Sequence, residues 1–300
     1  LLAALAAFYG DYAAAARNHR ELRHLLTPTN VANGFVGLWK GRAQPAAAFI
    51  TVGADAVRPA AADGSKPLLV VLVVGETARA ANFSLGGYAR ATNQALAGKG
   101  VVYFDKVTAC GTDTASSLPC MFSDLGAQRF TVTAAAGREN ALDVLQRAGV
   151  AVRWLDNNSG CKGVCQRVGT QLLAQGAMAS PCGTEECFDE MLLRGLRAGM
   201  PEPVTDSLVV LHMKGSHGPA YYKRYPSHAR RFVPTCDTNQ IQSCDRQALI
   251  NTYDNSIAYT SDVLAQTIDW LAGEADRMDS LLLYLSDHGE SLGERNVYLH

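Results

Sequence analysis

The chain has 300 residues, a formal net charge of −1 and 48% hydrophobic residues. This length can bury a large core, and one large domain behind a leader segment is the simplest organisation. A nearly neutral chain without a long run of Lys or Arg lacks the electrostatic footprint of a nucleic-acid-binding protein. We therefore expect no nucleic-acid partner.

The leader, residues 1–60, is predicted to form one or two amphipathic helices. It combines many alanines and a basic cluster at residues 17–23 with aromatic residues such as Tyr9, Tyr12 and Trp39. This composition suits a helix lying on a membrane surface, although an ordinary packing helix fits as well. The apolar run at residues 1–8 is far shorter than the roughly 20 residues that cross a bilayer. We interpret it as the end of a removed transmembrane helix.

From residue 68 onward, after a linker at residues 59–66, short apolar runs alternate with helical stretches. The predicted strands are residues 68–74, 150–155, 207–213 and 281–285, and the predicted helices between them include residues 141–148 and 252–271. Continuous apolar runs indicate strands that are buried on both faces. The sequence therefore predicts an α/β fold with a mostly parallel central sheet sandwiched by helices.

The eight cysteines lie as four pairs of near neighbours, namely Cys110 with Cys120, Cys161 with Cys165, Cys182 with Cys187, and Cys236 with Cys244. An even number in local pairs is typical of disulfides formed in an oxidising compartment such as the periplasm. Structural zinc is the alternative, but no pair has the two-residue spacing of common zinc knuckles. We expect the cysteines to staple loops, and the sequence leaves their connectivity open.

Candidate metal ligands follow three of the predicted strands. Glu76 follows the first strand, His217 the third, and Asp287 with His288 the fourth. Ligands in open α/β sheets bind outside the carboxyl ends of the strands, and carboxylate and imidazole suit zinc. Each residue alone has another explanation: a carboxylate at a helix start, a partly buried histidine, or a turn. Their coincidence at three strand ends favours a metal site.

The segment of residues 110–120 offers several hydroxyls beside this metal site. Thr114 is the candidate nucleophile because it precedes a predicted short helix at residues 115–125, whose free N–H groups would hold a phosphoryl group. A threonine hydroxyl is a weak nucleophile at neutral pH, and coordination to a metal would activate it. The alternative is that Thr114 caps the helix.

Five ordered groups of motifs carry a family resemblance: residues 75–79 (GETAR) with 81–88, residues 110–122, residues 156–159 (DNNS) with 162–164, residues 217–221 (HGPAY), and residues 286–294 (SDHGESLGE) with 298–300. Together they resemble the catalytic domain of lipid A phosphoethanolamine transferases, in the alkaline phosphatase and sulfatase superfamily. Residues 9–26 resemble the juxtamembrane linker of that family. The resemblance implies a catalytic domain at residues 61–300, C-terminally incomplete, in the periplasm at the bacterial inner membrane.

The resemblance also implies a site and a reaction. It assigns one firmly bound zinc to four ligands, Glu76, Thr114, Asp287 and His288, with Thr114 as the nucleophile. His217 and His300 would contact the phosphoryl group or hold a second, weaker zinc. Three further residues correspond to the substrate pocket: Asn158, Ser159 and Lys162. A monomer at the membrane surface would move phosphoethanolamine from phosphatidylethanolamine to lipid A through a phosphothreonine.

Other acceptors and other classes of protein stay open at this point. The acceptor could be a core sugar or a periplasmic glucan. A phosphodiesterase or sulfatase of the same superfamily would use water instead, although the Cys-x-Pro-x-Arg context of sulfatase nucleophiles is not found. A catalytically silent lipid-binding protein could also keep this fold. The complete set of ligands argues against that last alternative, because a binding module needs no zinc-activated threonine.

Overall fold

The computed structural model describes residues 48–60, 63–173, 182, 187–199 and 205–299, together with residues 31, 34 and 35. Most of the predicted amphipathic leader and the predicted site residue His300 lie outside these described residues. Within them, no helix is both long enough and apolar enough to span a bilayer.

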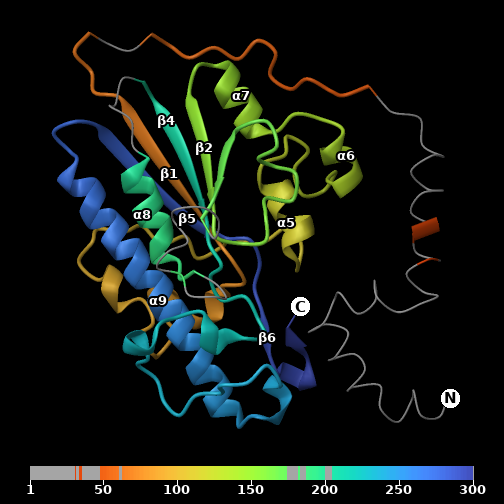
Figure 1. The fold of residues 1–300 in the computed structure, drawn as a ribbon, viewed down its shortest axis with the longest axis vertical. Coiled ribbons are helices and arrows are strands. Elements are labelled where there is room, and N and C mark those ends of the chain that lie inside the picture. The colour runs from red at the N-terminus through yellow and green to blue at the C-terminus, as the bar shows by residue number, and fades with distance from the viewer. Residues whose placement is uncertain are drawn as a thin grey trace.

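The central sheet has five strands in the order β3-β2-β4-β1-β5, and each pair of neighbours is parallel (Figure 1). Its strands are β1 Leu68–Gly75, β2 Ala151–Asp156, β3 Gly169–Leu172, β4 Ser207–His212 and β5 Asp279–Ser286. The four strands predicted from the sequence are confirmed, and β3 is an additional edge strand. Because all five strands run the same way, their carboxyl ends share one edge of the sheet.

Helices cover both faces of the sheet. They are α5 Thr114–Met121, α6 Val132–Ala136, α7 Ala141–Arg147, α8 Glu190–Ala198 and α9 Arg246–Gly273. Figure 1 shows α8 and α9 on one side of the sheet and α5, α6 and α7 on the other. The predicted α/β sandwich is therefore confirmed.

Alternating side chains of β1 explain its continuous apolar run. Leu69, Val71 and Val73 are buried in a cluster with leucines of α8 and α9. Val74 belongs to a second cluster with Leu118 of α5 and residues of α7 and β2. A strand that buries both faces needs apolar residues at successive positions. The double burial fixes the sheet between its two helical layers.

The long helix α9 begins at Arg246, earlier than the residue 252 expected from the sequence. Its N-cap is Asp245, whose carboxylate accepts hydrogen bonds from the backbone N–H groups of Gln247 at 2.8 Å and Ala248 at 3.2 Å. The first turns of α9, ahead of residue 252, contain the polar residues Arg246, Gln247 and the buried Asn251. Since these residues break the apolar periodicity, the sequence pattern placed the helix start too late.

Short elements complete the described fold. They are the 3₁₀ helices η1 Ala80–Asn82, η2 Ser84–Gly86, η3 Gln94–Leu96, η5 Tyr221–Lys223, η6 Ser227–Ala229, η7 Ile241–Ser243 and η8 Glu294–Asn296, and the antiparallel pair β6 Ser291–Leu292 and β7 Tyr298–Leu299.

All eight cysteines form disulfides between near neighbours, as their spacing predicted. The bonds are Cys110–Cys120, Cys161–Cys165, Cys182–Cys187 and Cys236–Cys244. No thiol is left to bind zinc. The bond between Cys110 and Cys120 joins the two ends of the segment that carries Thr114, so this staple fixes the start of α5.

Candidate metal centre

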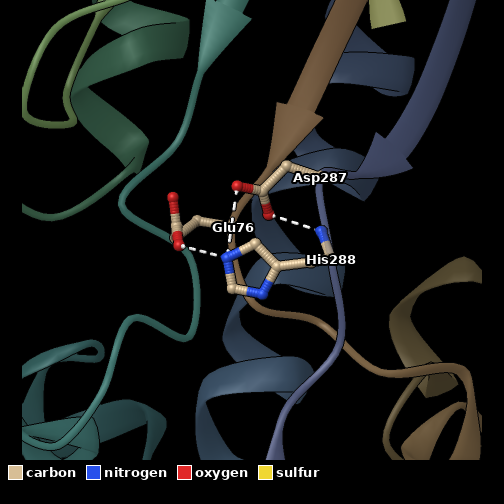
Figure 2. Close-up of side chains that lie close together, drawn as sticks. All are labelled: Glu76, Asp287 and His288. Atoms are coloured by element: carbon tan, nitrogen blue, oxygen red, sulfur yellow. Dashed lines mark hydrogen bonds and ion pairs between the residues drawn. The ribbon is translucent and has the colours of Figure 1, made fainter. Parts of the chain in front are cut away.

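Parallel pairing of β1 and β5 brings three predicted ligands together. Gly75 and Ser286 are partners in the register, so the next residues along the two chains, Glu76 and Asp287, emerge side by side. Figure 2 shows both carboxylates facing the ring of His288. All three residues are at most 2% exposed. Buried ionisable groups gathered at the end of a sheet are typical of a functional centre.

The orientation of the His288 ring suits a metal ligand. Its Nδ1 lies 2.7 Å from the carbonyl oxygen of Gly289, which can only accept a hydrogen bond, so Nδ1 carries the proton. Nε2 then faces the two carboxylates, at 3.4 Å from Oε1 of Glu76 and 3.5 Å from Oδ2 of Asp287 (Figure 2). A hydrogen bond from the other ring nitrogen to a carbonyl is the usual way to orient a metal-binding histidine.

Thr114 is the first residue of α5, and its hydroxyl completes the cluster. Oγ1 lies 3.0 Å from Oε2 and 3.1 Å from Oε1 of Glu76, and 3.4 Å from Nε2 of His288. The helix cap is Asp113, whose side chain accepts from the backbone N–H of Ser116. The alternative role of Thr114 as the cap is therefore wrong.

The four side chains fit a tetrahedral metal ion. A zinc ion with bonds of about 2.0–2.1 Å to oxygen and nitrogen sets its ligand atoms about 3.3 Å apart. The separations quoted above, which join Thr114 to Glu76 and His288, and His288 to Glu76 and Asp287, run from 3.0 to 3.5 Å. Oδ2 of Asp287 is buried and has no hydrogen-bond partner among the described residues. Such an oxygen is costly to bury unless a cation binds it.

Without a metal, the cluster favours a positive charge at its centre. Burial opposes the charged form of His288, yet the hydrogen bond to Glu76 and the charge of Asp287 raise its pKa to about 9. Burial and the charge of Glu76 raise the pKa of Asp287 to about 6. Burial also favours neutral Glu76, but the hydrogen bonds from His288 and Thr77 hold its pKa well below the ordinary value. A cation is therefore stabilised where the carboxylates meet.

Thr77 links two of the candidate ligands, and the sequence did not single it out. Its hydroxyl donates to Oε1 of Glu76 at 2.6 Å, and its backbone N–H donates to Oδ1 of Asp287 at 3.0 Å. The residue has a φ of 57°, which is unfavourable for a β-branched side chain. The hydroxyl of Tyr253 in α9 donates to the Thr77 carbonyl at 2.6 Å and fixes this turn. Strain at such a position is typical of functional sites.

Of the other predicted site residues, Asn158 reaches the cluster and two others contact each other instead. The side-chain amide of Asn158 donates to Oε2 of Glu76 at 2.7 Å. Nζ of Lys162 donates to the hydroxyl of Ser159 at 2.8 Å, and neither residue hydrogen-bonds the four-residue cluster in the described part of the chain.

His217 lies beside the cluster, in the loop after β4. The neighbouring Ser216 donates its backbone N–H to the carbonyl of Glu76 at 2.9 Å. Burial lowers the pKa of His217 to about 4, so the ring is neutral at physiological pH. A neutral imidazole has a lone pair for a metal or for a hydrogen-bond donor.

The chain matches two family models. The one described as Sulfatase matches residues 69–300, and the one described as Phosphoethanolamine transferase EptA/EptB matches residues 1–43. Phosphoethanolamine transferase EptA of Escherichia coli (strain K12) is 44% identical over 100% of this chain and 55% of its own length. Phosphatidylethanolamine transferase Mcr-1 of Escherichia coli is 43% identical over 100% of this chain and 58% of its own length. The chain thus spans about half the length of the curated relatives it matches.

Solved structures show the same likeness. The soluble domain of lipooligosaccharide phosphoethanolamine transferase A from Neisseria meningitidis is similar with a TM-score of 0.80 at 44% identity, over 85% of this chain and 77% of that one. The integral membrane protein of that name from the same organism has a TM-score of 0.83 at 41% identity, over 100% of this chain and 56% of that one. The chain belongs to the sulfatase family and, within it, to the phosphoethanolamine transferases.

Proposed function

We propose that this protein transfers phosphoethanolamine from phosphatidylethanolamine to a phosphate of lipid A, with Thr114 as the nucleophile. The observation that carries the proposal is the Thr114 hydroxyl, which lies within 3.4 Å of both Glu76 and His288. A hydroxyl at the start of a helix and against proposed metal ligands suits phosphoryl transfer. In this reaction, catalysis depends mainly on positioning and on neutralisation of charge. The names of the relatives indicate which group is moved.

Glu76, Thr114, Asp287 and His288 would hold one zinc ion. A zinc ion held there supplies positive charge that eases deprotonation of the Thr114 hydroxyl and neutralises the phosphoryl oxygens. The chain's own residues set the geometry, because Thr77 and Asn158 each donate to one carboxylate oxygen of Glu76. His217 would contact the phosphoryl group, or hold a second, weaker zinc together with His300.

The proposed reaction has two balanced displacements. In the first, Oγ1 of Thr114 bonds to phosphorus and loses its proton, the bond from phosphorus to the diacylglycerol oxygen breaks, and that oxygen takes up a proton. In the second, a phosphate oxygen of lipid A gives up its proton and bonds to the same phosphorus, the bond from phosphorus to Oγ1 breaks, and Oγ1 takes up that proton to regenerate the hydroxyl. Lys162 would place its ammonium beside the phosphates as a point charge. The intermediate is a phosphoethanolamine ester of Thr114.

The proposed place of this chemistry is the periplasmic face of the bacterial inner membrane. Four local disulfides suit an oxidising compartment. A relative at 41% identity over the whole chain is an integral membrane protein. Residues 1–60 would form the juxtamembrane linker, and residues 61–300 the catalytic domain that meets both lipid substrates.

A transfer assay with separated acceptors tests the proposal. Purified protein is incubated with headgroup-labelled phosphatidylethanolamine and, in separate reactions, with lipid A, core sugar or glucan. We expect label on lipid A with the wild-type protein and none with Thr114→Val. Thr133→Val, at an exposed threonine of α6, is the matched control and should transfer normally. Label only on a sugar acceptor would overturn the proposed acceptor, and transfer by Thr114→Val would overturn the nucleophile.

A further inference from the structure

A buried acid–histidine pair lies beside the metal centre, and the proposed mechanism does not use it. Asp156 is the last residue of β2 and His212 the last residue of β4, and the two are partners in the parallel register. Both side chains are 0% exposed. Burying an ionisable pair costs free energy. Its presence at the carboxyl ends of the strands, beside the metal centre, therefore indicates a function beyond packing.

The hydrogen bonds around Asp156 fix the tautomer of His212. Oδ2 of Asp156 lies 3.0 Å from Nδ1 of His212 and accepts from the Trp154 indole N–H at 2.9 Å. Oδ1 accepts from the backbone N–H of Asn158 at 2.8 Å. Burial favours neutral Asp156, but the hydrogen bonds from His212, Trp154 and the backbone of Asn158 together lower its pKa, so the carboxylate only accepts. Nδ1 of His212 therefore donates this hydrogen bond, and Nε2, which faces the amide nitrogen of Asn158, is placed as an acceptor.

That acceptor helps to fix the side chain of Asn158. Nε2 of His212 lies 3.4 Å from the amide nitrogen of Asn158, which also donates to the carbonyl of Met213 at 2.9 Å and to Oε2 of Glu76 at 2.7 Å. The amide oxygen accepts from the backbone N–H of Ser159 at 2.7 Å. Only acceptors surround the amide nitrogen, so the amide cannot flip without losing these hydrogen bonds.

We propose that Asp156 and His212 are positioning residues of the metal centre, which act through Asn158 to hold Glu76 in its ligand geometry. The inference rests on the proposed function and assigns Asn158 a role toward Glu76 beside its expected role in the substrate pocket. The pair holds Asn158 at two points, its backbone N–H on Asp156 and its amide beside His212. Partners of this kind behind a metal ligand set its orientation and affinity.

Asp156→Asn is the most direct variant. An amide in place of the carboxylate must turn an N–H group toward Trp154 and His212 or toward the backbone of Asn158, each of which donates to Asp156 in the wild type. The His212 tautomer then changes, or one of these hydrogen bonds is lost. We expect a roughly tenfold lower affinity for Zn²⁺ or Co²⁺, the lower end of the range for partners that contact a metal ligand directly. The visible absorption spectrum of bound Co²⁺ should shift, because the ligand geometry changes.

A double-mutant cycle separates positioning from general stabilisation. Metal dissociation constants are measured by chelator competition for the wild type, Asp156→Asn, Asn158→Ala and the double variant. If Asp156 acts through Asn158, its substitution should lower affinity by less than about threefold once Asn158 is alanine. Asp262→Asn breaks a distant ion pair to Arg231, 2.7 Å in the wild type, and serves as the control with unchanged affinity and spectrum.

His212→Asn keeps the test decisive where Asp156→Asn does not fold. Its shorter amide can still donate to Asp156 but offers no acceptor opposite Asn158, so metal affinity should fall while cooperative thermal unfolding is retained. Unchanged affinity in a folded variant, or additive losses in the cycle, would overturn the positioning role and leave the proposed function standing. A wild-type protein that binds neither metal would overturn both.

Discussion

The hydroxyl oxygen of Thr114 lies 3.0 Å from one carboxylate oxygen of Glu76 and 3.1 Å from the other. The first residue of α5 thus meets the residue directly after β1, and their contact joins a helix start to a strand end. This relationship places the proposed nucleophile against one of the proposed metal ligands. Substitutions at Thr114 should therefore separate catalysis from metal binding.

Thr114→Val keeps the shape of the side chain but removes its hydroxyl. We expect transfer activity to fall by at least about 10³-fold, because the nucleophile is lost. Three of the four proposed metal ligands remain, so the variant should still bind zinc with lower affinity. Thr114→Ser keeps the hydroxyl and should retain measurable transfer. Metal content by atomic emission and transfer rate are measured on the same samples, and a Val variant as active as the Ser variant would contradict the assignment.

The hydroxyl of Thr77 should contribute to the stability of the folded protein through its hydrogen bond to Glu76. Thr77→Val keeps the branched side chain at a φ of 57° but removes the donor to Oε1 of Glu76. A buried acceptor that loses its donor costs about 1–3 kcal/mol, so we expect the free energy of unfolding to fall by that amount. Thr77→Ser keeps the donor and should match the wild type or exceed it. Denaturant unfolding measures the free energy of unfolding of both variants. An equal decrease in Thr77→Val and Thr77→Ser would refute the role of the hydrogen bond.

Gly215 lets two loops approach at Glu76. It has a φ of +52°, and a Cβ there would lie 2.6 Å from the carbonyl oxygen and 2.8 Å from the backbone nitrogen of Glu76. We expect Gly215→Ala to lower both the thermal midpoint and zinc affinity. Gly126→Ala is the matched control, since Gly126 has a φ of +65° with nothing near its Cβ. In both variants, an alanine in the left-handed conformation costs roughly 1–2 kcal/mol. The difference in stability between the two variants therefore reports on the contact with Glu76.

Metal affinity should rise with pH. The pKa of about 9 at His288 means that a metal must displace a proton from this ring at any lower pH. Affinity should then increase about tenfold per pH unit up to pH 9 and level off above it. Below pH 6 the slope should steepen, because Asp287, with a pKa of about 6, is protonated too. Chelator competition from pH 5.5 to 9.5 measures this, and a flat profile would contradict the cluster described above.

The same raised pKa predicts how the stability of the metal-free protein depends on pH. His288 binds its proton more tightly when folded, from an ordinary 6.5 to about 9. Its contribution to stability is therefore fully present below about pH 6.5 and lost as pH rises to about 9. His288→Asn should lack this decline. Saturating zinc should remove it as well, because the metal replaces the proton.

Much of the fold could be predicted because burial leaves a strong mark on sequence. The continuous apolar run of β1 follows from its burial on both faces, and Glu76 could be found because it directly follows that run. The edge strand β3, Gly169–Leu172, could not be predicted from the sequence, because it is short, mostly exposed and polar. Helix α8 was also missed, although it has apolar residues on one face.

The site residues that were missed all depend on contacts between segments that lie far apart in the sequence. Asp156 and His212 come together only through the parallel register of β2 and β4, which no local pattern encodes. Thr77 lies inside a motif that was noticed, but its role depends on a left-handed backbone and on Tyr253 in α9. Glu76, Asp287 and His288 were found because they follow directly after apolar strands. Their mutual distances needed the structure.

The central claim is that Thr114 carries the phosphoethanolamine group between the two substrates. The most direct measurement is mass spectrometry of the protein after incubation with phosphatidylethanolamine in the absence of acceptor. The account predicts that the peptide containing Thr114 gains the mass of one phosphoethanolamine group, that fragmentation places it on Thr114, and that later addition of lipid A removes it. An unmodified Thr114 in a preparation that transfers, or the group on another residue, would contradict the account.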